Sequence, residues 1–223
     1  MFRDRKEAGL RLAEKLKYRE LRDPVVLAIP CGGVAIGAML ARELGAELNV
    51  VLSRKLRAPG QSELSVGAIS ENGETCLNHF AQQVAGVTER YLARERGDQL
   101  SQIARQRELF STAWAPAILS GRSVILTDDG IANGSTIMAA LQVIKSRNPY
   151  EVIVAVPVAS MDSSRALEGI CRACDEFVCL HSSRLFWGID QYYSDFTPVQ
   201  DDEAVELLRE YGSAECKAAT VTA

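Results

Sequence analysis

Two adjacent acids followed by a loop of small residues form the strongest chemical pattern in the sequence. Asp128 and Asp129 come directly after the apolar run 123–127, and a helical pattern begins at Ser135. A loop before a helix N-terminus can direct several backbone N–H groups at one anion. Carboxylates suit hydroxyl groups beside a phosphate, or a divalent metal. The pattern predicts a site for a phosphorylated ribose, with these candidate residues: Asp128, Asp129, Gly130, Ile131, Ala132, Asn133, Gly134, Ser135 and Thr136.

Two other interpretations of this segment are weaker. Asp128-Asp129-Gly130 could be only a turn with a helix cap, because such turns are common, but a turn needs neither paired acids nor the Gly134-Ser135-Thr136 cluster. The glycines at 32 and 37 have the spacing of a nucleotide-binding P-loop, yet they continue into Ala38-Met39 instead of Lys-Ser/Thr.

Strands and helices alternate along the chain. Apolar runs predict strands that are buried on both faces. Their alternation with helices predicts an α/β fold, a parallel twisted sheet flanked by helices. In such a fold, ligands bind at the carboxyl ends of the strands. The expected strands are 25–29, 48–53, 123–127, 152–158 and 177–180, and the expected helices are 4–20, 34–44, 88–110, 135–146, 163–173 and 201–211. A loop containing Pro59-Gly60 and a hairpin of 64–70 and 75–77 around Asn72-Gly73 lie between them.

Composition limits the classes of function. The 223 residues carry a net charge of −4, which gives no electrostatic case for binding nucleic acid or an anionic membrane. The charged start is not a secretory signal, and the longest uncharged stretch, 24–41, is interrupted by Pro30 and glycines. We therefore expect a cytoplasmic protein whose six cysteines are thiols.

Val124 to Thr136 resembles the phosphoribosyl pyrophosphate (PRPP) motif of type I phosphoribosyltransferases. The similarity to a bacterial subgroup of predicted phosphoribosyltransferases extends over 28–33, 54–60, 63–69, 154–159 and 186–196, and spans about 2–211. The resemblance implies a Rossmann-like core with a small hood and lid. We expect one domain at 1–211, a lid at about 56–85, an aromatic hood at about 182–200 and a flexible tail at 212–223.

The resemblance also implies roles for these residues. Amides of the loop before the helix would hold the 5-phosphate, and the acid pair would hold the ribose hydroxyls. The pyrophosphate would contact Cys31, Gly32, Gly33, Arg54 and Lys55, with Mg²⁺ held mainly through PRPP and also by Asp128 and Asp129. The family reaction transfers the 5-phosphoribosyl group to a nitrogenous base or related amine and releases pyrophosphate. It rests on positioning and electrostatics, so no catalytic side chain is assigned.

Two segments leave alternatives open. Aromatic residues of the hood, namely Phe186, Trp187 and Tyr193, offer stacking faces to a planar acceptor, or they form a satellite hydrophobic cluster. Cys31 stands where the subgroup usually has an arginine, so a fixed cation is lost near the pyrophosphate. That loss favours the runner-up function, a PRPP- or nucleotide-binding regulator without turnover.

A third function is a zinc or thiol protein that uses Cys171, Cys174, Cys179 and His181. Free cysteines are among the most buried residues, however, and a domain of this size needs no metal to fold. The expected partners are PRPP and a small nitrogenous acceptor, with a homodimer as a further possibility.

Overall fold

A five-stranded parallel sheet forms the centre of the molecule. The structure is a computed structural model that describes residues 1–78, 80–113, 115–161 and 164–212. The sheet order is β2-β1-β6-β7-β8, and every neighbouring pair is parallel. The strands are β1 (Val25–Ala28), β2 (Glu47–Val50), β6 (Ser123–Thr127), β7 (Glu151–Ser160) and β8 (Glu176–Ser183). The predicted α/β class with a parallel sheet is confirmed.

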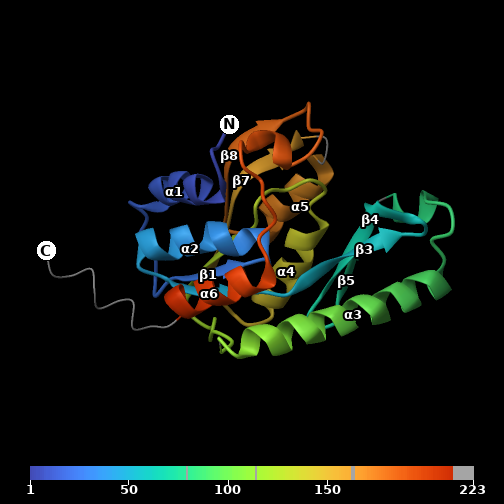
Figure 1. Cartoon of the computed structure of the whole chain (residues 1–223), viewed down its shortest axis with the longest axis horizontal. Helices are drawn as coiled ribbons and strands as arrows, with labels where there is room; N and C mark the ends of the chain where they lie inside the picture. Colours follow the sequence, from blue (N-terminus) through green and yellow to red (C-terminus); the bar gives the residue numbers. More distant parts are fainter. Residues whose placement is uncertain (79, 114, 162–163, 213–223) are drawn as a thin grey trace, which may run out of the picture.

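Helices cover both faces of this sheet (Figure 1). On one face lie α1 (Arg5–Leu16), α2 (Gly32–Leu44) and α6 (Asp201–Tyr211), and on the other lie α4 (Ser135–Lys145) and α5 (Ser164–Ala173). Each face has its own buried apolar cluster, with Leu12 and Leu40 in the first and Leu141 and Ile170 in the second. Burial on both faces explains why the strands read as continuous apolar runs.

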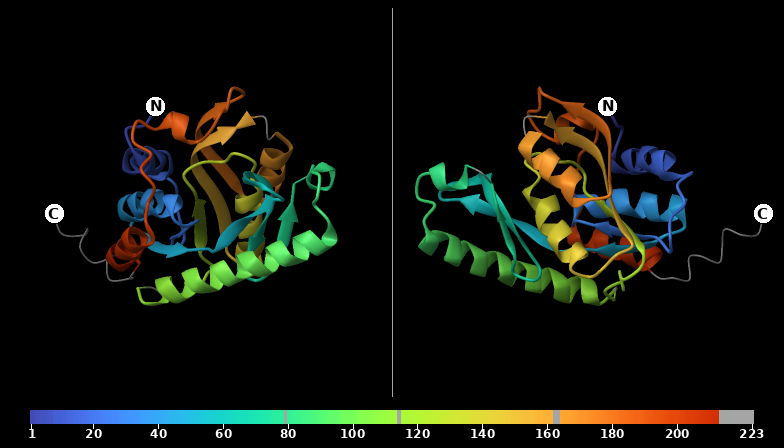
Figure 2. Two further views of the ribbon diagram at one scale, coloured as in Figure 1. Left: turned by 45° about the vertical axis from the view of Figure 1, so that its right-hand side comes forward. Right: turned by 180° about the vertical axis from the view of Figure 1, so that it is seen from behind.

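A second, antiparallel sheet leaves the core as an arm. It consists of β3 (Ser53–Ala58), β4 (Gln61–Ser70) and β5 (Thr75–Leu77), in the order β3-β4-β5. The helix α3 (Glu89–Ser111) runs along the arm, and the arm projects beyond the edge of the core in the views of Figure 2. The predicted hairpin is present, and Gly73 at its turn has a φ of 86°.

One segment of the arm differs from the expected structure. Residues 54–58 belong to β3, whereas the sequence suggested a loop leading to Pro59-Gly60. Charged residues alternate there with buried ones, because Leu56 and Ala58 face the arm's interior while Lys55 and Arg57 are exposed. A strand with one buried face tolerates charges at every second position, so the charges concealed the strand.

The strand expected at 48–53 is divided, because β2 ends at Val50 and Ser53 begins β3 of the other sheet. The remaining predicted boundaries shift by a few residues at helix and strand ends. The first helix ends at Leu16, and the strand expected at 177–180 extends over Glu176–Ser183. The expected tail begins at Gly212, and its residues 213–223 lie outside the described part of the chain. No described helix is long and apolar enough to cross a membrane.

Candidate functional site

The candidate site lies where β1 and β6 end side by side. In chain order the core strands are arranged 2-1-3-4-5, so the connections after β1 and β6 leave the sheet in opposite directions. Such a switch point opens a crevice at the carboxyl ends of the strands. The loop after β1 contains a cis peptide bond between Pro30 and Cys31, and the loop after β6 carries Asp128 and Asp129. The topology therefore brings the two predicted loops together.

Two glycines allow the loops to approach closely. A Cβ atom on Gly32 would lie 2.1 Å from Oδ2 of Asp129, and one on Gly33 would lie 3.1 Å from Cα of Asp128. Any larger residue at these positions would push the loop away from the acid pair. Gly32 and Gly33 thus bring the backbone after β1 against the acids.

The acid pair is electrostatically asymmetric. Burial and the neighbouring charge of Asp129 raise the pKa of Asp128 well above its usual range. Burial also raises the pKa of Asp129, but the Arg5 guanidinium, which donates to Oδ2 through Nε (3.1 Å) and Nη2 (3.0 Å), opposes this rise. Asp128 Oδ1 accepts instead from the backbone N–H of Asp129 at 2.8 Å.

The loop after the acids is pinned to the sheet and leads into α4. Ile131 pairs with β7, since its N–H donates to Val158 O (2.9 Å) and its carbonyl accepts from Ser160 N (2.8 Å). Gly134 has a φ of 76° and stands directly before the helix, where the first N–H groups lack intrahelical partners. A pocket forms here, and α4 lies beside the arm (Figure 1). Its lining is Lys55, Asp128, Asp129, Gly130, Ile131, Ala132, Asn133, Gly134, Thr136, Ile137 and Ile189.

Ser135 is the one predicted loop residue that does not line this pocket. Its side chain is buried, and both its N–H (3.2 Å) and its hydroxyl (2.7 Å) donate to Oδ1 of Asn133. Asn133 therefore shapes the turn before α4, and Thr136 is left as the hydroxyl at the pocket wall.

Lys55 and Arg54 lie on opposite faces of β3, as neighbours in a strand must. Lys55 lines the pocket, and its positive charge opposes the rise in the pKa of both aspartates. Arg54 faces α3, where Nε donates to Gln99 (3.0 Å) and Nη1 donates to Gln106 (3.2 Å). Of these two predicted pyrophosphate contacts, Lys55 is the one that the arm brings to the acid pair.

Cys31 is connected to the last helix. Its Sγ donates to Oδ1 of Asp201 at 3.0 Å. Burial and this carboxylate raise the pKa of the Cys31 thiol to about 12, so the thiol is neutral at physiological pH. The side chain at position 31 thus faces the beginning of α6.

The aromatic residues of the segment expected to form a hood, about 182–200, separate into two groups. Trp187 is 88% exposed, and the ring of Phe186 stacks on that of Tyr192 with centroids 5.5 Å apart. Tyr193 is buried, and its hydroxyl donates to the backbone O of Asp129 at 2.7 Å. Ile189, which the sequence did not single out, closes over Gly130 and lines the pocket.

Arg5 is the second residue that sequence reasoning missed. It lies 124 positions before Asp129 in the chain, in the first turn of α1. The one signal in the sequence was an arginine at a position that helical periodicity places on the buried face, together with Leu12 and Leu16.

The cysteines on α5 and β8 do not assemble a metal centre. Cys171 is exposed, and Cys179 Sγ donates to the backbone O of His181 at 3.1 Å. Within the part of the chain that the structure describes, no group of three or more His, Cys, Asp or Glu side chains could hold a metal ion.

Magnesium fits this site only in part. Oxygen ligands are present in Asp128 and Asp129, but Mg²⁺ demands octahedral coordination. Oδ2 of Asp129 already accepts from Arg5. The donor set therefore suits an ion that is held mainly by a bound ligand rather than by a cage of protein side chains.

The sheet order and the loops after β1 and β6 define a doubly wound α/β protein with a crevice at the switch point. The family model for the phosphoribosyl transferase domain matches residues 4–196 of this sequence. The chain therefore belongs to the phosphoribosyl transferase family.

Relatives with curated names support this assignment. "Putative phosphoribosyl transferase Rv0571c" and "Putative phosphoribosyl transferase MT0597", from two strains of Mycobacterium tuberculosis, are each 36% identical to this chain over 208 residues. The match covers 93% of this chain and 46% of each relative. The chain thus spans about half the length of these curated relatives.

Solved structures agree on the fold. TT1426 from Thermus thermophilus is 40% identical, with a TM-score of 0.76 over 95% of this chain and 99% of that chain. A hypothetical protein from Neisseria gonorrhoeae with bound ppGpp is 16% identical, with a TM-score of 0.51 over 96% of this chain and 99% of that one. At this lower identity the likeness concerns the fold alone.

Proposed function

We propose that the chain binds PRPP and transfers its 5-phosphoribosyl group to a nitrogenous base or related amine, with release of pyrophosphate. The observation that carries this proposal is the pocket in which an acid pair, the N-terminal end of α4 and Lys55 line one hollow. This combination offers a binding site for an anion next to carboxylates that accept hydrogen bonds from hydroxyl groups. A phosphorylated ribose presents the matching phosphate and hydroxyl groups.

The binding roles follow from the chemistry of each wall. The N–H groups at the beginning of α4 and the hydroxyl of Thr136 would receive the 5-phosphate. The carboxylates of Asp128 and Asp129 would accept hydrogen bonds from the ribose diol. Lys55 would approach the pyrophosphate from the arm, and Gly32 and Gly33 would let the loop after β1 reach the same group.

The transfer needs no protein nucleophile. The lone pair of the acceptor nitrogen forms a bond to C1 of the ribose, while the bond from C1 to the pyrophosphate oxygen breaks and its electron pair leaves with pyrophosphate. The proton on the acceptor nitrogen is released to solvent. Positive charge that develops on the ribose is stabilised by the nearby carboxylates. When bound with PRPP, Mg²⁺ would neutralise negative charge on the departing pyrophosphate.

The acceptor would enter beside the hood. Ile189 supplies an apolar wall next to Gly130, and the Phe186–Tyr192 stack lies in the same segment. Trp187 is exposed and free to cover a planar ring. These features suit a planar nitrogenous acceptor without distinguishing one base from another.

A thermal-shift titration with PRPP and Mg²⁺ tests the binding site. We expect the midpoint to rise for the native protein and to rise much less for Asp128→Asn, since losing a charged hydrogen bond to a hydroxyl costs about 1.5–3 kcal/mol. Asp98→Asn removes an exposed carboxylate from α3 and serves as the matched control. An equal response of Asp128→Asn and the control would exclude the acid pair as the ribose site.

A regulator that binds PRPP without turnover is the second candidate. The neutral Cys31 thiol favours it, because position 31 itself carries no positive charge, although the charge of Arg54 acts on the thiol from β3. A panel of bases assayed with PRPP and Mg²⁺ for pyrophosphate release distinguishes the two functions. Release with any base supports the transferase, whereas a thermal shift without release on the whole panel supports the regulator.

A further inference from the structure

Arg5 forms a buried ion pair with Asp129 of the acid pair. Its guanidinium directs Nε and Nη2 at the same oxygen of Asp129, at 3.1 and 3.0 Å. The two side chains are only 9% and 16% exposed. The third nitrogen, Nη1, donates to the backbone O of Thr197 at 2.8 Å, so all three guanidinium nitrogens have partners.

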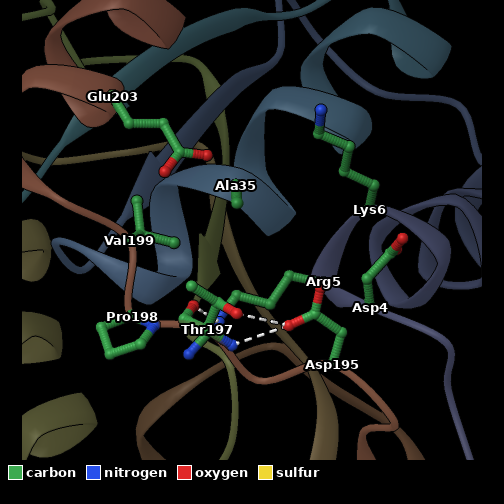
Figure 3. A pocket seen from close by; sticks show the side chains of 9 residues that line it. All are labelled: Asp4, Arg5, Lys6, Ala35, Asp195, Thr197, Pro198, Val199 and Glu203. Atoms are coloured by element: carbon green, nitrogen blue, oxygen red, sulfur yellow. Dashed lines mark hydrogen bonds between the residues drawn. The ribbon is translucent and has the colours of Figure 1, made fainter.

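Aromatic rings hold the guanidinium in this position. Its carbon lies 3.8 Å from the centroid of the Phe196 ring and 6.0 Å from that of Tyr193. Tyr193 in turn donates to the backbone of Asp129. Figure 3 shows Arg5 beside Thr197 and Asp195, while Lys6 stands apart from this cluster. Arg5 is therefore a fixed cation, in contrast to the exposed Lys55.

The ion pair lies between two hollows. Arg5 lines the outer pocket of Figure 3, and Asp129 lines the inner pocket with Asp128. A free divalent cation that approached Oδ2 of Asp129 would have to displace the Arg5 guanidinium. The two hydrogen bonds from Arg5 to this oxygen would then be lost. Repulsion between two cations a few ångströms apart is strong in a poorly solvated site.

We propose that Arg5 is a positioning residue of the acid pair, which orients Asp129 and excludes free divalent cations from it, leaving Asp128 and the other carboxylate oxygen of Asp129 to accept hydrogen bonds from the ligand. The proposal rests on the proposed function for the identity of that ligand. Its test needs no phosphoribosyl compound, so the two can fail independently.

Direct binding of Mn²⁺, measured by electron paramagnetic resonance on the protein without PRPP, tests this role. We expect no binding to the acid pair in the native protein. Arg5→Met should bind Mn²⁺ at the acid pair, with an affinity at least about tenfold above the detection limit set by the native protein. The reason is that the acids then lack their fixed cation. Arg5→Lys restores a cation and should lose most of this gain, and Arg5→Met combined with Asp129→Asn should lose it as well.

Arg11→Met is the matched control, since Arg11 lies on the same helix and pairs with Glu7 rather than with the acid pair. A purely structural role for Arg5 predicts lower stability without any Mn²⁺ binding. The proposal is overturned if native protein binds Mn²⁺ at Asp129, if folded Arg5→Met gains nothing, or if Arg11→Met gains equally. Far-ultraviolet circular dichroism establishes folding. Should Arg5→Met not fold, Arg5→Gln, which still donates to Asp129 without charge, must show the gain.

Discussion

Asp128 and Asp129 are neighbours in sequence, yet their carboxyl groups have different surroundings. Asp129 is balanced by a guanidinium, whereas burial and the adjacent negative charge act together on Asp128. A carboxyl group in this situation destabilises the folded chain once it ionises. The cost is typical of a residue that is retained for binding rather than for folding.

Asp128→Asn should therefore stabilise the unliganded protein. The raised pKa means that the folded chain binds this proton more tightly than the unfolded chain, so the free energy of unfolding falls as the pH rises from the ordinary aspartate range through the raised value. At pH 7 we expect a gain of about 1–2 kcal/mol for the variant. The gain should vanish as the pH falls toward the ordinary value. Thermal denaturation across pH measures it, and a gain independent of pH would contradict this explanation.

Cys31→Arg tests what an arginine can do in the loop after β1. The thiol faces Asp201 at 3.0 Å, so we expect the new guanidinium to pair with that carboxylate and to raise PRPP affinity only slightly. Adding Asp201→Asn should release the guanidinium and strengthen binding of PRPP, but not of ribose 5-phosphate, by about tenfold. Calorimetry in Mg²⁺ compares the two ligands. A full gain from the single variant would show that Asp201 does not compete.

At the scale of elements, the arm brings Lys55 to the core. Glu71, at the turn between β4 and β5, is a polar link to the core, because its side chain accepts from Arg147 at 2.6 Å and lies 3.4 Å from Arg107 of α3. Its side chain is 8% exposed, and its N–H donates to Leu52 O at 2.9 Å. One carboxylate thus joins the hairpin, α3 and the end of α4.

Glu71→Gln should loosen the arm. We expect the free energy of unfolding to fall by about 1–2 kcal/mol, between the values typical of exposed and buried ion pairs. Amide hydrogen exchange should accelerate in β3–β5 more than in the central sheet. Glu74→Gln, an exposed residue of the same hairpin, is the matched control. Uniform acceleration across the core would argue against an arm-specific link.

At the scale of the whole molecule, the first residues close against the hood. Phe2 is fully buried, and its N–H donates to Tyr192 O at 2.7 Å, while Ser194 N donates to Phe2 O at 2.8 Å. The ring of Phe2 lies 5.5 Å from that of Tyr193. Segments from opposite ends of the chain therefore build one wall behind Asp129.

Phe2→Ala should cost about 3–4 kcal/mol of unfolding free energy, as expected for removing a buried phenyl ring. Urea denaturation measures the loss, with Tyr18→Ala as the control, since Tyr18 is 91% exposed and should change stability by less than about 0.5 kcal/mol. A loss as small as that of the control would mean that the first residues do not hold the wall.

The sequence by itself determined the features that depend on neighbouring residues. The apolar run 123–127 predicted β6, the helix expected at 88–110 forms as α3, and Asn72-Gly73 forms the predicted turn. These features follow from periodicity, capping and backbone preferences within a few residues. The family pattern around Asp128 and Asp129 is local in the same sense.

Only the tertiary structure decided which distant side chains meet at the acids. It brought Arg5 to Asp129, divided Lys55 from Arg54 across β3, and turned Tyr193 inward as a support for Asp129. Such contacts leave no periodic signal, because they depend on how helices and strands pack across the sheet rather than on spacing along the chain. The charged strand β3 escaped prediction for a related reason, since its buried face exists only once α3 and β4 cover it.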